Sequence, residues 1–586
     1  MSKILRYSMA VAVILMAPAV LGFTPVPAGP VSGTWPAAGS PYLVQGDIAI
    51  PDGSQLTIAS GVEVVFEGLY TLDVLGSLLA VGAAQDSIVF TATDTEVGWQ
   101  GISFESGAEP SVIDFGVIEH GRGTTAGGGI TCRTANLTLT RSRISHNRAA
   151  WGGGINVSVS EGTPTISECI ISDNECEDAG GGICWAGMNI VLTNCRVENN
   201  TMHGNSDSSP GGAGIYCWGF FVGSTEITGC TVRNNRIFGL GRGAGIYMDG
   251  AMHEGATISH CDIEHNIAES FGGGGLYIGN TQDCNINNCR FSFNYGPFHM
   301  ISWNGSGSAI SLGSGNNTVT HCTFDHNFCG SSGTVFCRSN TSLTMDSCTF
   351  SHNMDNCADG GGALRLEGDA AITNTIVGNQ QSNFGGNPSA AINFISGTHS
   401  VRHCDLFGSF GGIDVTGPAM PEGLGTITGT NANGHPCDDC ANIYLDGLFC
   451  DAPEGDLQIA ENSPCLGAGE DGVTIGAHGV GCQAIGVPWP STPEVANLVQ
   501  NYPNPFNPTT TIEYRLSRAG AVRLEVYDLQ GRLVRQLRGG EQEPAGRHEA
   551  TWDGRDLCGR EMAAGTYLYR LEVGTTRQSR SMVLVR

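Results

Sequence analysis

The side chains best suited to touch a ligand come from one long segment between two sequence repeats. This segment carries Tyr295, Phe298, His299 and Trp303. Aromatic rings of this kind can stack on a sugar, and their polar edges can donate hydrogen bonds. The same rings could instead pack the segment against the body of the protein, and the two interpretations carry nearly equal weight. We place the expected ligand-binding site here.

No residue can be assigned a catalytic role from its spacing. Enzymes that cleave polysaccharides generally use two carboxyl groups. His120 follows a glutamate, and Asp438 and Asp439 are adjacent outside the repeats, but neither step lies in a context that matches such a site. Lys3 is the only lysine, and it lies in a segment that we expect to be removed, so a lysine base is excluded.

Metal ligands are also not specified by the sequence. His146, His265, His326 and His352 occupy one position of successive repeats and could form a metal-binding stripe, but an outward polar ladder is the simpler interpretation. The acidic run at 173–178 could hold calcium, but a solvated turn on an acidic protein is the favoured interpretation. We expect no cofactor and no resident metal, with calcium left open.

The elements that position these side chains follow from a repeat that closes on asparagine. It recurs every 26 to 35 residues, at Asn147, Asn174, Asn200, Asn235, Asn266, Asn294, Asn327, Asn353 and Asn379. A repeat of this length, with glycine-rich steps, short alternating apolar segments and no helical stripe, predicts coils of a parallel β-helix. Asparagine tolerates the left-handed turn conformation and can hydrogen-bond along a stack, so we expect a structural Asn ladder.

A column of cysteines lies five residues before the closing asparagine. Its members are Cys169, Cys195, Cys230, Cys261, Cys289, Cys322 and Cys348. A second column mixes cysteine with Val, Ile, Leu and Phe, which indicates that cysteine acts here as a small buried hydrophobic residue. We therefore favour a structural ladder of free thiols over disulfides, although 22 cysteines in an exported chain would also suit a disulfide framework.

Disulfides are expected after residue 430, where the repeat is interrupted. This segment holds Cys437, Cys440, Cys450, Cys465 and Cys482. Cys437 and Cys440 have the spacing of a zinc or redox pair, but no second such pair follows, so a structural disulfide is favoured. Five cysteines leave one unpaired, and the sequence alone does not assign the connectivity.

Composition excludes several functions. The chain has 586 residues, of which 86 are glycine, and a formal net charge of −28 at pH 7. This acidity argues against nucleic-acid binding, because phosphates would be repelled. A hydrophobic fraction of 40% is too high for a disordered chain. Beyond the N-terminal segment, no stretch is apolar enough to cross a membrane as a helix.

The chain is expected to divide into six segments. Lys3 and Arg6 precede a short apolar stretch, which is typical of a secretory signal peptide. The expected segments are a signal peptide at 1–22, an N-terminal cap with the first coils at 23–110, the main coils at 111–415, a Cys-rich C-terminal cap at 416–486, a Pro-rich linker at 487–500 and a small antiparallel β-sandwich at 501–586.

The C-terminal segment resembles a known export domain. The stretches at 501–508, 526–534, 552–554 and 564–567 together are similar to the type IX secretion sorting domain and its Ig-like relatives from the flagellar hook cap. The final strand of that family often carries lysine, whereas this chain has arginine at 580 and 586. The resemblance implies passage through the outer membrane by the type IX machinery, followed by release or attachment at the cell surface.

The repeats resemble those of right-handed parallel β-helix proteins with the pectin lyase-like fold. The steps at 291–294, 324–327 and 350–353 also fit the FxxN motif of polymorphic outer membrane protein repeats. Those proteins are surface adhesins, whereas other β-helices are polysaccharide lyases or glycoside hydrolases. We expect a secreted or cell-surface β-helix that binds glycans or surfaces, with a lyase or hydrolase as the alternative.

Overall fold

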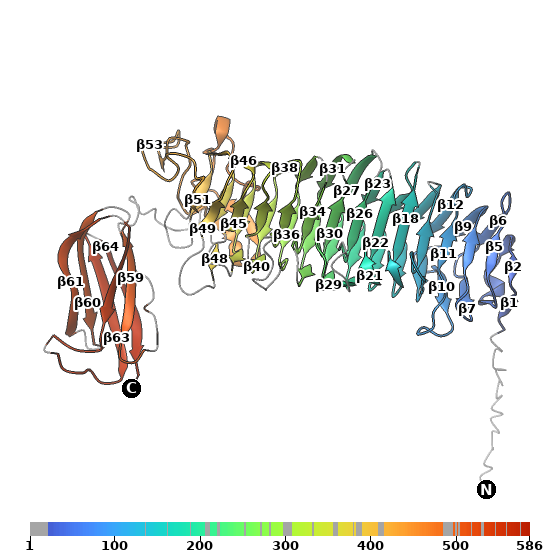
Figure 1. Ribbon diagram of the computed structural model, residues 1–586, viewed down its shortest axis with the longest axis horizontal. Coiled ribbons are helices and arrows are strands. Elements are labelled where there is room, and N and C mark those ends of the chain that lie inside the picture. Colours follow the sequence, from blue (N-terminus) through green and yellow to red (C-terminus); the bar gives the residue numbers. More distant parts are fainter. Residues whose placement is uncertain are drawn as a thin grey trace, which may run out of the picture.

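A parallel β-solenoid forms the main part of the computed structural model (Figure 1). The all-β fold class predicted from the repeat is confirmed, and only short 3-10 turns, η1 (Ala37–Gly39), η2 (Ala452–Glu454) and η3 (Glu470–Gly472), interrupt the strands in the described part of the chain. The structure describes residues 22–134, 136–160, 162–187, 189–204, 211–219, 223–250, 253–269, 272–280, 283–296, 307–330, 333–355, 361–378, 380–382, 390–407, 415–483, 496–498, 501, 504, 506–516, 519–528, 532–544, 546–557, 559–574 and 576–585.

Three long parallel sheets make the walls of the solenoid, and we name them A, B and C. Sheet A has 15 strands: β1 (Thr24–Val26), β4 (Tyr42–Val44), β7 (Glu63–Phe66), β10 (Ile88–Ala92), β13 (Gly116–Glu119), β16 (Arg143–Ser145), β20 (Ile170–Ser172), β24 (Arg196–Glu198), β28 (Thr231–Arg233), β32 (Asp262–Glu264), β36 (Arg290–Ser292), β39 (Thr323–Asp325), β43 (Thr349–Ser351), β47 (Ile376–Gly378) and β51 (Asp405–Phe407). Sheet B also has 15: β2 (Gly29–Pro30), β5 (Ile48–Ile50), β8 (Leu72–Val74), β11 (Ile102–Phe104), β14 (Ile130–Cys132), β18 (Ile155–Val159), β22 (Ile183–Gly187), β26 (Ile215–Trp218), β30 (Ile246–Asp249), β34 (Leu276–Ile278), β37 (Ile310–Leu312), β41 (Val335–Cys337), β45 (Gly361–Leu366), β49 (Ala390–Phe394) and β52 (Val415–Thr416). Sheet C has 14: β3 (Gly33–Trp35), β6 (Gln55–Ile58), β9 (Ser77–Val81), β12 (Ser111–Asp114), β15 (Leu137–Thr140), β19 (Thr165–Ser167), β23 (Ile190–Thr193), β27 (Gly223–Thr228), β31 (His253–Ser259), β35 (Cys284–Asn287), β38 (Asn316–Thr320), β42 (Ser342–Asp346), β46 (Asp369–Thr373) and β50 (His399–Arg402).

Two short parallel sheets, D and E, lie between the strands of sheet A and those of sheet B along the chain. Sheet D contains β17 (Arg148–Trp151), β21 (Glu175–Ala179), β25 (Thr201–Gly204), β29 (Arg236–Gly239) and β33 (Ile267–Ala268). Sheet E contains β40 (Phe328–Cys329), β44 (Met354–Asp355) and β48 (Gln381–Ser382).

Many strands of the solenoid alternate between buried and outward residues, and the inward residues build the core. In β28, Val232 is fully buried while Thr231 and Arg233 on either side point outward. Stacking in register places the interior residues of successive coils above one another, so a single apolar core runs along the solenoid. The residues that alternate outward form long columns, and these columns are the surfaces on which function must be sought.

Two prolines in the first coil hinder strand addition to sheets A and B. Residues 23–42, at the start of the segment expected to hold the N-terminal cap and the first coils, contribute β1, β2 and β3, the first strand of each long sheet. Thr24 donates its N–H to Pro41, and Gly29 donates its N–H to Asp47, so the nitrogens of the next residues, Pro25 and Pro30, face the open edge. Proline has no N–H, which removes donors that another strand would need.

After the last coil the chain folds back over the outer face of sheet A. We call residues 445–482 the strap; it contains β55 (Phe449–Asp451), β56 (Asp456–Ala460) and β57 (Val480–Cys482) and follows a hairpin of β53 (Gly429–Thr430) and β54 (Pro436–Cys437). Gly476 N–H donates to the Asn374 carbonyl at 2.7 Å, and Ala477 N–H donates to Thr349 Oγ1 at 2.9 Å. The strap thus shields strands β43 to β51, and a small second core fills the space beneath it.

The C-terminal residues form a two-sheet antiparallel sandwich. One sheet contains β58 (Ala496–Leu498), β59 (Thr510–Leu516) and β62 (Gly546–Trp552); the other contains β60 (Gly520–Tyr527), β61 (Leu533–Glu543), β63 (Gly565–Val573) and β64 (Thr576–Leu584). Trp552, Tyr514 and Tyr569 are buried in its core. In the described residues of the whole chain, no helix has the length and apolar character needed to cross a bilayer.

Candidate functional site

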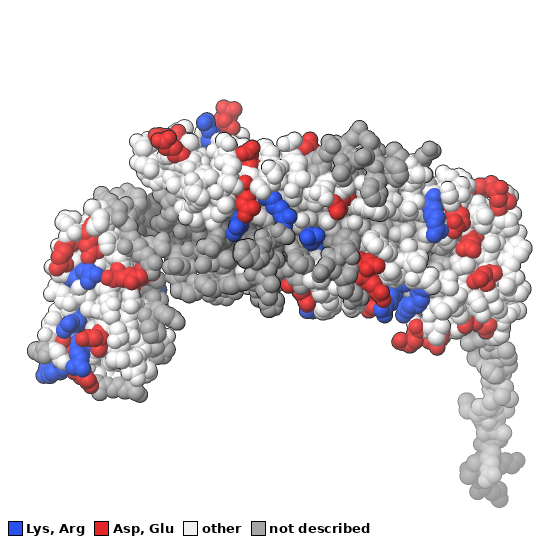
Figure 2. All heavy atoms as spheres, viewed as in Figure 1, with Lys and Arg blue, Asp and Glu red and all other residues white. Residues whose placement is uncertain are grey.

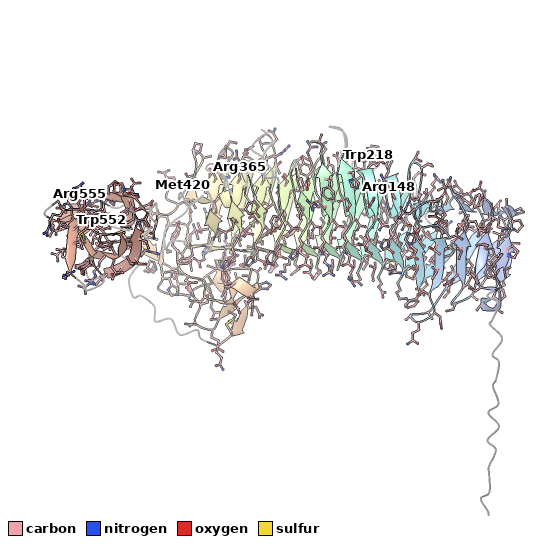
Figure 3. All side chains as sticks on the ribbon, turned by 90° about the horizontal axis from the view of Figure 1, so that it is seen from below. Arg148, Trp218, Arg365, Met420, Trp552 and Arg555 are labelled. Atoms are coloured by element: carbon pink, nitrogen blue, oxygen red, sulfur yellow. A yellow bond between two sulfur atoms is a disulfide. The ribbon has the colours of Figure 1, made fainter. Side chains whose placement is uncertain are left out.

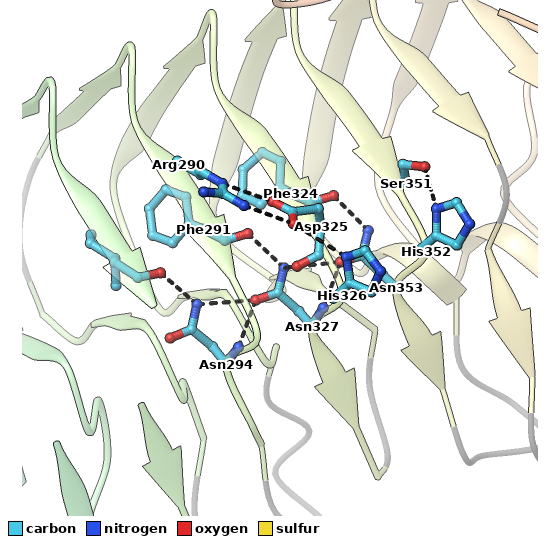
Figure 4. A network of polar contacts seen from close by, with 11 residues as sticks. Arg290, Phe291, Asn294, Phe324, Asp325, His326, Asn327, Ser351, His352 and Asn353 are labelled. Atoms are coloured by element: carbon cyan, nitrogen blue, oxygen red, sulfur yellow. Dashed lines mark hydrogen bonds and ion pairs between the residues drawn. The ribbon is translucent and has the colours of Figure 1, made fainter. Parts of the chain in front are cut away.

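The closing asparagines lie in a fully buried hydrogen-bonded ladder (Figure 4). Asn294 Nδ2 donates to Asn327 Oδ1 at 3.0 Å and to the Ile263 carbonyl at 2.8 Å, and the Asn294 N–H donates to the same Asn327 oxygen. The pattern repeats from Asn147 to Asn353, while Asn379 lies outside the described residues. Since both amide groups are used inside the protein, these side chains are not available to a ligand.

The cysteine column is also internal. Cys169 N–H donates to Cys195 Sγ at 3.4 Å, and all seven column members are buried free thiols. Thr375 takes the next place in the column, because its hydroxyl accepts the Cys348 N–H. Burial raises the pKa of Cys404, which follows Thr375, to about 12. Such thiols remain protonated at neutral pH and cannot act as nucleophiles.

One disulfide forms in the segment after residue 430, between Cys450 and Cys482. Cys437 and Cys440 are both free thiols, so the structural role in disulfides that we favoured for them is wrong. The chain turns tightly around Asp438, whose carboxylate accepts the N–H of Cys440 at 2.9 Å. The turn leaves Cys437 in the second core and Cys440 at the surface, while Cys465 is a buried thiol.

The residues expected to bind a ligand are only partly described. Tyr295 extends sheet D, where it bridges Ile267 and Phe328, and its ring centroid lies 5.9 Å from that of Phe328. Phe298, His299 and Trp303 lie outside the described residues. The expected cluster therefore stays a prediction.

An aromatic stripe that the sequence reasoning missed runs along the outer face of sheet B. Tyr216, Tyr247 and Tyr277 stack in register on β26, β30 and β34, with ring centroids 5.4 and 5.1 Å apart. Trp151 and Trp218 pack against them and are partly exposed. Each tyrosine follows the first buried residue of its strand, so the alternation of the repeat could have revealed the stripe.

The tyrosines form the buried base of this stripe. Tyr216 is 3% exposed and Tyr277 is 5% exposed, and burial raises the pKa of Tyr216 and Tyr247 well above the usual value of a phenol. The Tyr247 hydroxyl donates to Asp249 Oδ2 at 3.0 Å. The phenols are therefore uncharged and held in place.

Arginines surround the C-terminal end of the stripe. The Arg242 and Arg338 guanidinium carbons lie 5.5 and 5.9 Å from the Tyr277 ring centroid, and Arg338 and Arg365 each lie 5.8 Å from that of Phe336. These distances are typical of cation–π contacts. Figure 2 shows basic side chains gathered over this part of the solenoid, and Figure 3 places Trp218 and Arg365 on one side of it.

Carboxylates on the outer face of sheet A are held in ion pairs. Glu198 contacts Arg196 at 2.6 Å and Arg233 at 2.8 Å. Burial alone would raise the pKa of Glu198, but the two guanidinium groups outweigh it and lower that pKa. Asp325 pairs in the same way with Arg290 and lies 3.3 Å from His326 Nδ1 (Figure 4). A carboxyl group with a lowered pKa, such as that of Glu198, is a poor general acid.

The other candidate acids and histidines also serve structure. Asp438 accepts hydrogen bonds from Asn442 and Tyr444. The ring centroids of His120 and His146 lie 5.5 Å apart in an outward column. A longer stack of rings contains His265, Phe293, His326 and His352. In the acidic run, Glu175 and Glu177 both contact Arg148. No cluster of three or more potential metal ligands occurs within the described ranges.

One carboxyl group on the outer face of sheet B has a raised pKa. Asp73 on β8 is half-buried, and its pKa is raised mainly by burial and further by the negative charges of Glu105 and Asp47. Thr71 donates a hydrogen bond to it, and Arg133 pairs with Glu105 at 2.9 Å. A raised pKa moves a carboxyl group toward the range in which a general acid works.

A cavity of about 600 Å³ lies between the strap and the neighbouring corner of the solenoid. It is lined by His321, Asp346, Glu470 and His478, among others. The Asp346 carboxylate already accepts hydrogen bonds from Thr373 and Asn374, and burial lowers the pKa of His478. The acid thus holds the corner together, and the cavity is a weaker candidate than the aromatic stripe.

Comparison with known proteins matches two families. The right-handed β-helix region family matches residues 84–243 and 244–420, and the FlgD Ig-like domain family matches residues 506–578. No curated protein sequence matches significantly. Two solved structures from Porphyromonas gingivalis share short regions with this chain. Dimeric latent PorU has 26% identity over 18% of this chain and 10% of PorU, with a TM-score of 0.14. PorZ, titled an essential bacterial surface component of the type IX secretion system, has 23% identity over 15% of this chain and 11% of PorZ, with a TM-score of 0.12. The chain thus spans about a tenth of the length of either protein.

Proposed function

Because the chain belongs to the right-handed β-helix family, we propose that it is an exported protein that binds glycans or cell surfaces in an adhesin-like role. Its solenoid supplies the binding surface, and its Ig-like domain serves as the type IX sorting signal. The contact lies on the aromatic stripe of sheet B. The mature protein is secreted or held at the outer cell surface.

The aromatic stripe is the single observation that carries the binding role. Trp151 and Trp218 offer partly exposed rings beside a base of stacked tyrosines. Ring faces attract the apolar faces of sugars, and arginines can donate to their oxygens. Because the tyrosines are already locked by packing, little side-chain entropy is lost when a ligand binds. The ion-paired carboxylates of sheet A further favour binding over catalysis.

The export role rests on the C-terminal domain. The FlgD Ig-like match covers residues 506–578. The stretch at 501–508, which resembles the sorting domain, overlaps the start of the match, and the stretch at 552–554 begins on the last residue of β62. The test is to delete residues 501–586 in a host with a type IX system. Accumulation of the truncated protein in the periplasm supports the role, whereas unchanged surface delivery contradicts it.

The binding role is tested with the full-length protein on an array of soluble glycans. Retention of the wild type on at least one glycan, and a loss of about tenfold in affinity for Trp218→Ala, are expected because interface aromatic residues often contribute this much. Phe23→Ala removes an exposed aromatic residue of the first coil and is the matched control. Absence of binding to every glycan overturns the proposal.

A polysaccharide lyase or hydrolase is the second candidate, and the raised pKa of Asp73 favours it. The protein is incubated with a panel of polysaccharides, with and without calcium, and the products are analysed by chromatography. Turnover that is lost in Asp73→Asn supports catalysis at β8. Binding without products, in the same samples, supports the adhesin-like role instead.

A further inference from the structure

The outer face of sheet C has a composition that sets it apart from the other walls. Its strands lie along the upper edge of the solenoid in Figure 1. From β15 to β42, two outward columns stack in continuous register. Hydroxyl side chains dominate both columns: Thr138, Thr140, Thr165, Ser167, Thr193, Thr228, Thr257, Ser259, Thr318, Thr320 and Thr344. We call this set the hydroxyl face.

Charge is nearly absent from the hydroxyl face. The remaining outward positions hold Val191, Asn285 and Asn287, together with Glu226 and, at the end, Asp346. Strand propensity favours threonine on any exposed strand, so it cannot by itself explain the difference from sheet A. Over the same coils, sheet A carries outward charges on most strands: Arg143, Arg196, Glu198, Arg233, Asp262, Glu264, Arg290 and Asp325. A chain with a net charge of −28 has therefore kept one long wall nearly neutral.

The hydroxyls of this face are also available for bonding. Thr228 and Ser259 contact each other at 3.0 Å, and Thr140 donates to Asp114. Within the described part of the chain, the hydroxyls of Thr165, Thr257 and Thr318 make no hydrogen bond to protein. Each hydroxyl can donate one hydrogen bond and accept two.

The geometry of the face is periodic. Parallel strands repeat at about 4.8 Å, and alternate residues along a strand lie about 7 Å apart. The buried residues between the two columns, such as Ile258 and Val319, anchor each strand to the core. The hydroxyls therefore form a rigid two-dimensional array, which suits a partner that is itself ordered.

We infer that the hydroxyl face docks onto the surface of an ordered, uncharged polysaccharide. Charge favours this partner. The acidic chain repels anionic polymers, whereas an uncharged polysaccharide can approach the nearly neutral hydroxyl face without repulsion. Rigidity on both sides limits the entropy lost on contact. The face is separate from the aromatic stripe, so it adds a second contact, for solid rather than soluble glycan.

The experiment measures depletion of the full-length protein by particles of microcrystalline cellulose and of chitin. Retention should persist at about 1 M NaCl, where charge interactions are screened within about 3 Å. Thr257→Lys/Thr318→Lys should weaken retention about tenfold, which corresponds to about 1.4 kcal/mol. Thr231→Lys on the outer face of sheet A is the matched control and should bind as the wild type does.

A second pair of variants separates docking from misfolding. Thr257→Ser/Thr318→Ser keeps the hydroxyls and should retain binding, whereas Thr257→Val/Thr318→Val keeps the shape and should lose it. Failure of the wild type to adsorb, adsorption only to ice or to anionic particles, or full retention by the lysine variant overturns the inference. Binding of soluble glycans by the lysine variant, in the array described above, shows whether the aromatic stripe still functions by itself.

Discussion

Cys465 Sγ lies 3.2 Å from Asp405 Oδ2, although 60 residues separate the two along the chain. Asp405 is on β51, the last strand of sheet A, and Cys465 is in the strap that folds back over it. The Leu445 N–H donates to the other carboxylate oxygen at 3.1 Å. This buried carboxyl group thus joins the solenoid to the strap.

Strap docking should weaken as the pH rises. Burial raises the pKa of Asp405 to about 8, whereas an unfolded aspartate titrates near about 3.9. Between about pH 4 and pH 8, Asp405 is therefore protonated in the folded protein and ionised in the unfolded chain. The contribution of Asp405 to stability is complete below about pH 4 and declines until about pH 8.

Asp405→Asn should remove this dependence and stabilise the protein at pH 8. The measurement is the urea midpoint from pH 5 to pH 9. Asp262→Asn, a change at an exposed site on β32, should leave the slope unaltered. An Asp405→Asn variant with the pH profile of the wild type would show that the carboxyl group is not protonated when buried.

Breaking one rung of the Asn ladder should be costly. Asn294→Ala removes the acceptor of the Asn266 N–H and Nδ2 and the donor to the Ile263 carbonyl. Each buried polar group left unpaired costs about 1–3 kcal/mol, so we expect a loss of about 3–5 kcal/mol in urea denaturation followed by circular dichroism.

The control for the Asn ladder is Asn316→Ala. Asn316 is exposed and bonds only to Asp283 through its side chain, so its loss should cost less than about 1 kcal/mol. Equal losses for the two variants would contradict a special role for the ladder.

Reducing agent should loosen the strap and leave the solenoid intact. The Cys450–Cys482 bond closes a loop across β55 to β57. Such a crosslink typically contributes about 2–4 kcal/mol. We expect faster proteolysis within residues 445–482 in Cys450→Ser/Cys482→Ser, measured by mass spectrometry, with cleavage between β15 and β42 unchanged. Uniform sensitivity along the chain would mean that strap and solenoid unfold together.

Thiol labelling should separate Cys440 from the ladder cysteines. Cys440 is the half-exposed thiol of the described residues, whereas the ladder thiols are buried. Iodoacetamide should modify Cys440 in the native protein and reach Cys230 only after denaturation, because the reagent needs an accessible thiolate. Peptide mapping gives the result. Rapid native labelling of Cys230 would show that the coils open.

The sequence was sufficient for the coils because equivalent residues stack and leave a periodic signal. Asn294 and Cys289 could be placed in columns because every coil needs a residue of that kind there. Outward positions are under no such constraint. Tyr247 follows the alternation, and its partners Tyr216 and Tyr277 hold the same position in neighbouring coils, so the stripe becomes visible only when the coils are aligned.

The strap could not be predicted for a different reason. Ala477 meets Thr349 across 128 residues, and that contact repeats nowhere. The turn around Asp438 likewise separates Cys437 from Cys440. It depends on the hydrogen bond from the Cys440 N–H to the Asp438 carboxylate, which the spacing of the cysteines does not reveal. Single long-range contacts of this kind have no pattern in the sequence.

The prolines of the first coil limit the addition of further strands at the N-terminal end of the solenoid. A parallel solenoid is a template onto which another copy could lay strands and grow into a filament. Pro25 and Pro30 have no N–H to donate at the N-terminal end of the solenoid. There, β4 is the one described strand that pairs with β1, and the other edge of β1 is open. At the opposite end the strap folds back over the last strands of sheet A. Growth of a filament by strand addition is therefore hindered at the first strands of sheets A and B.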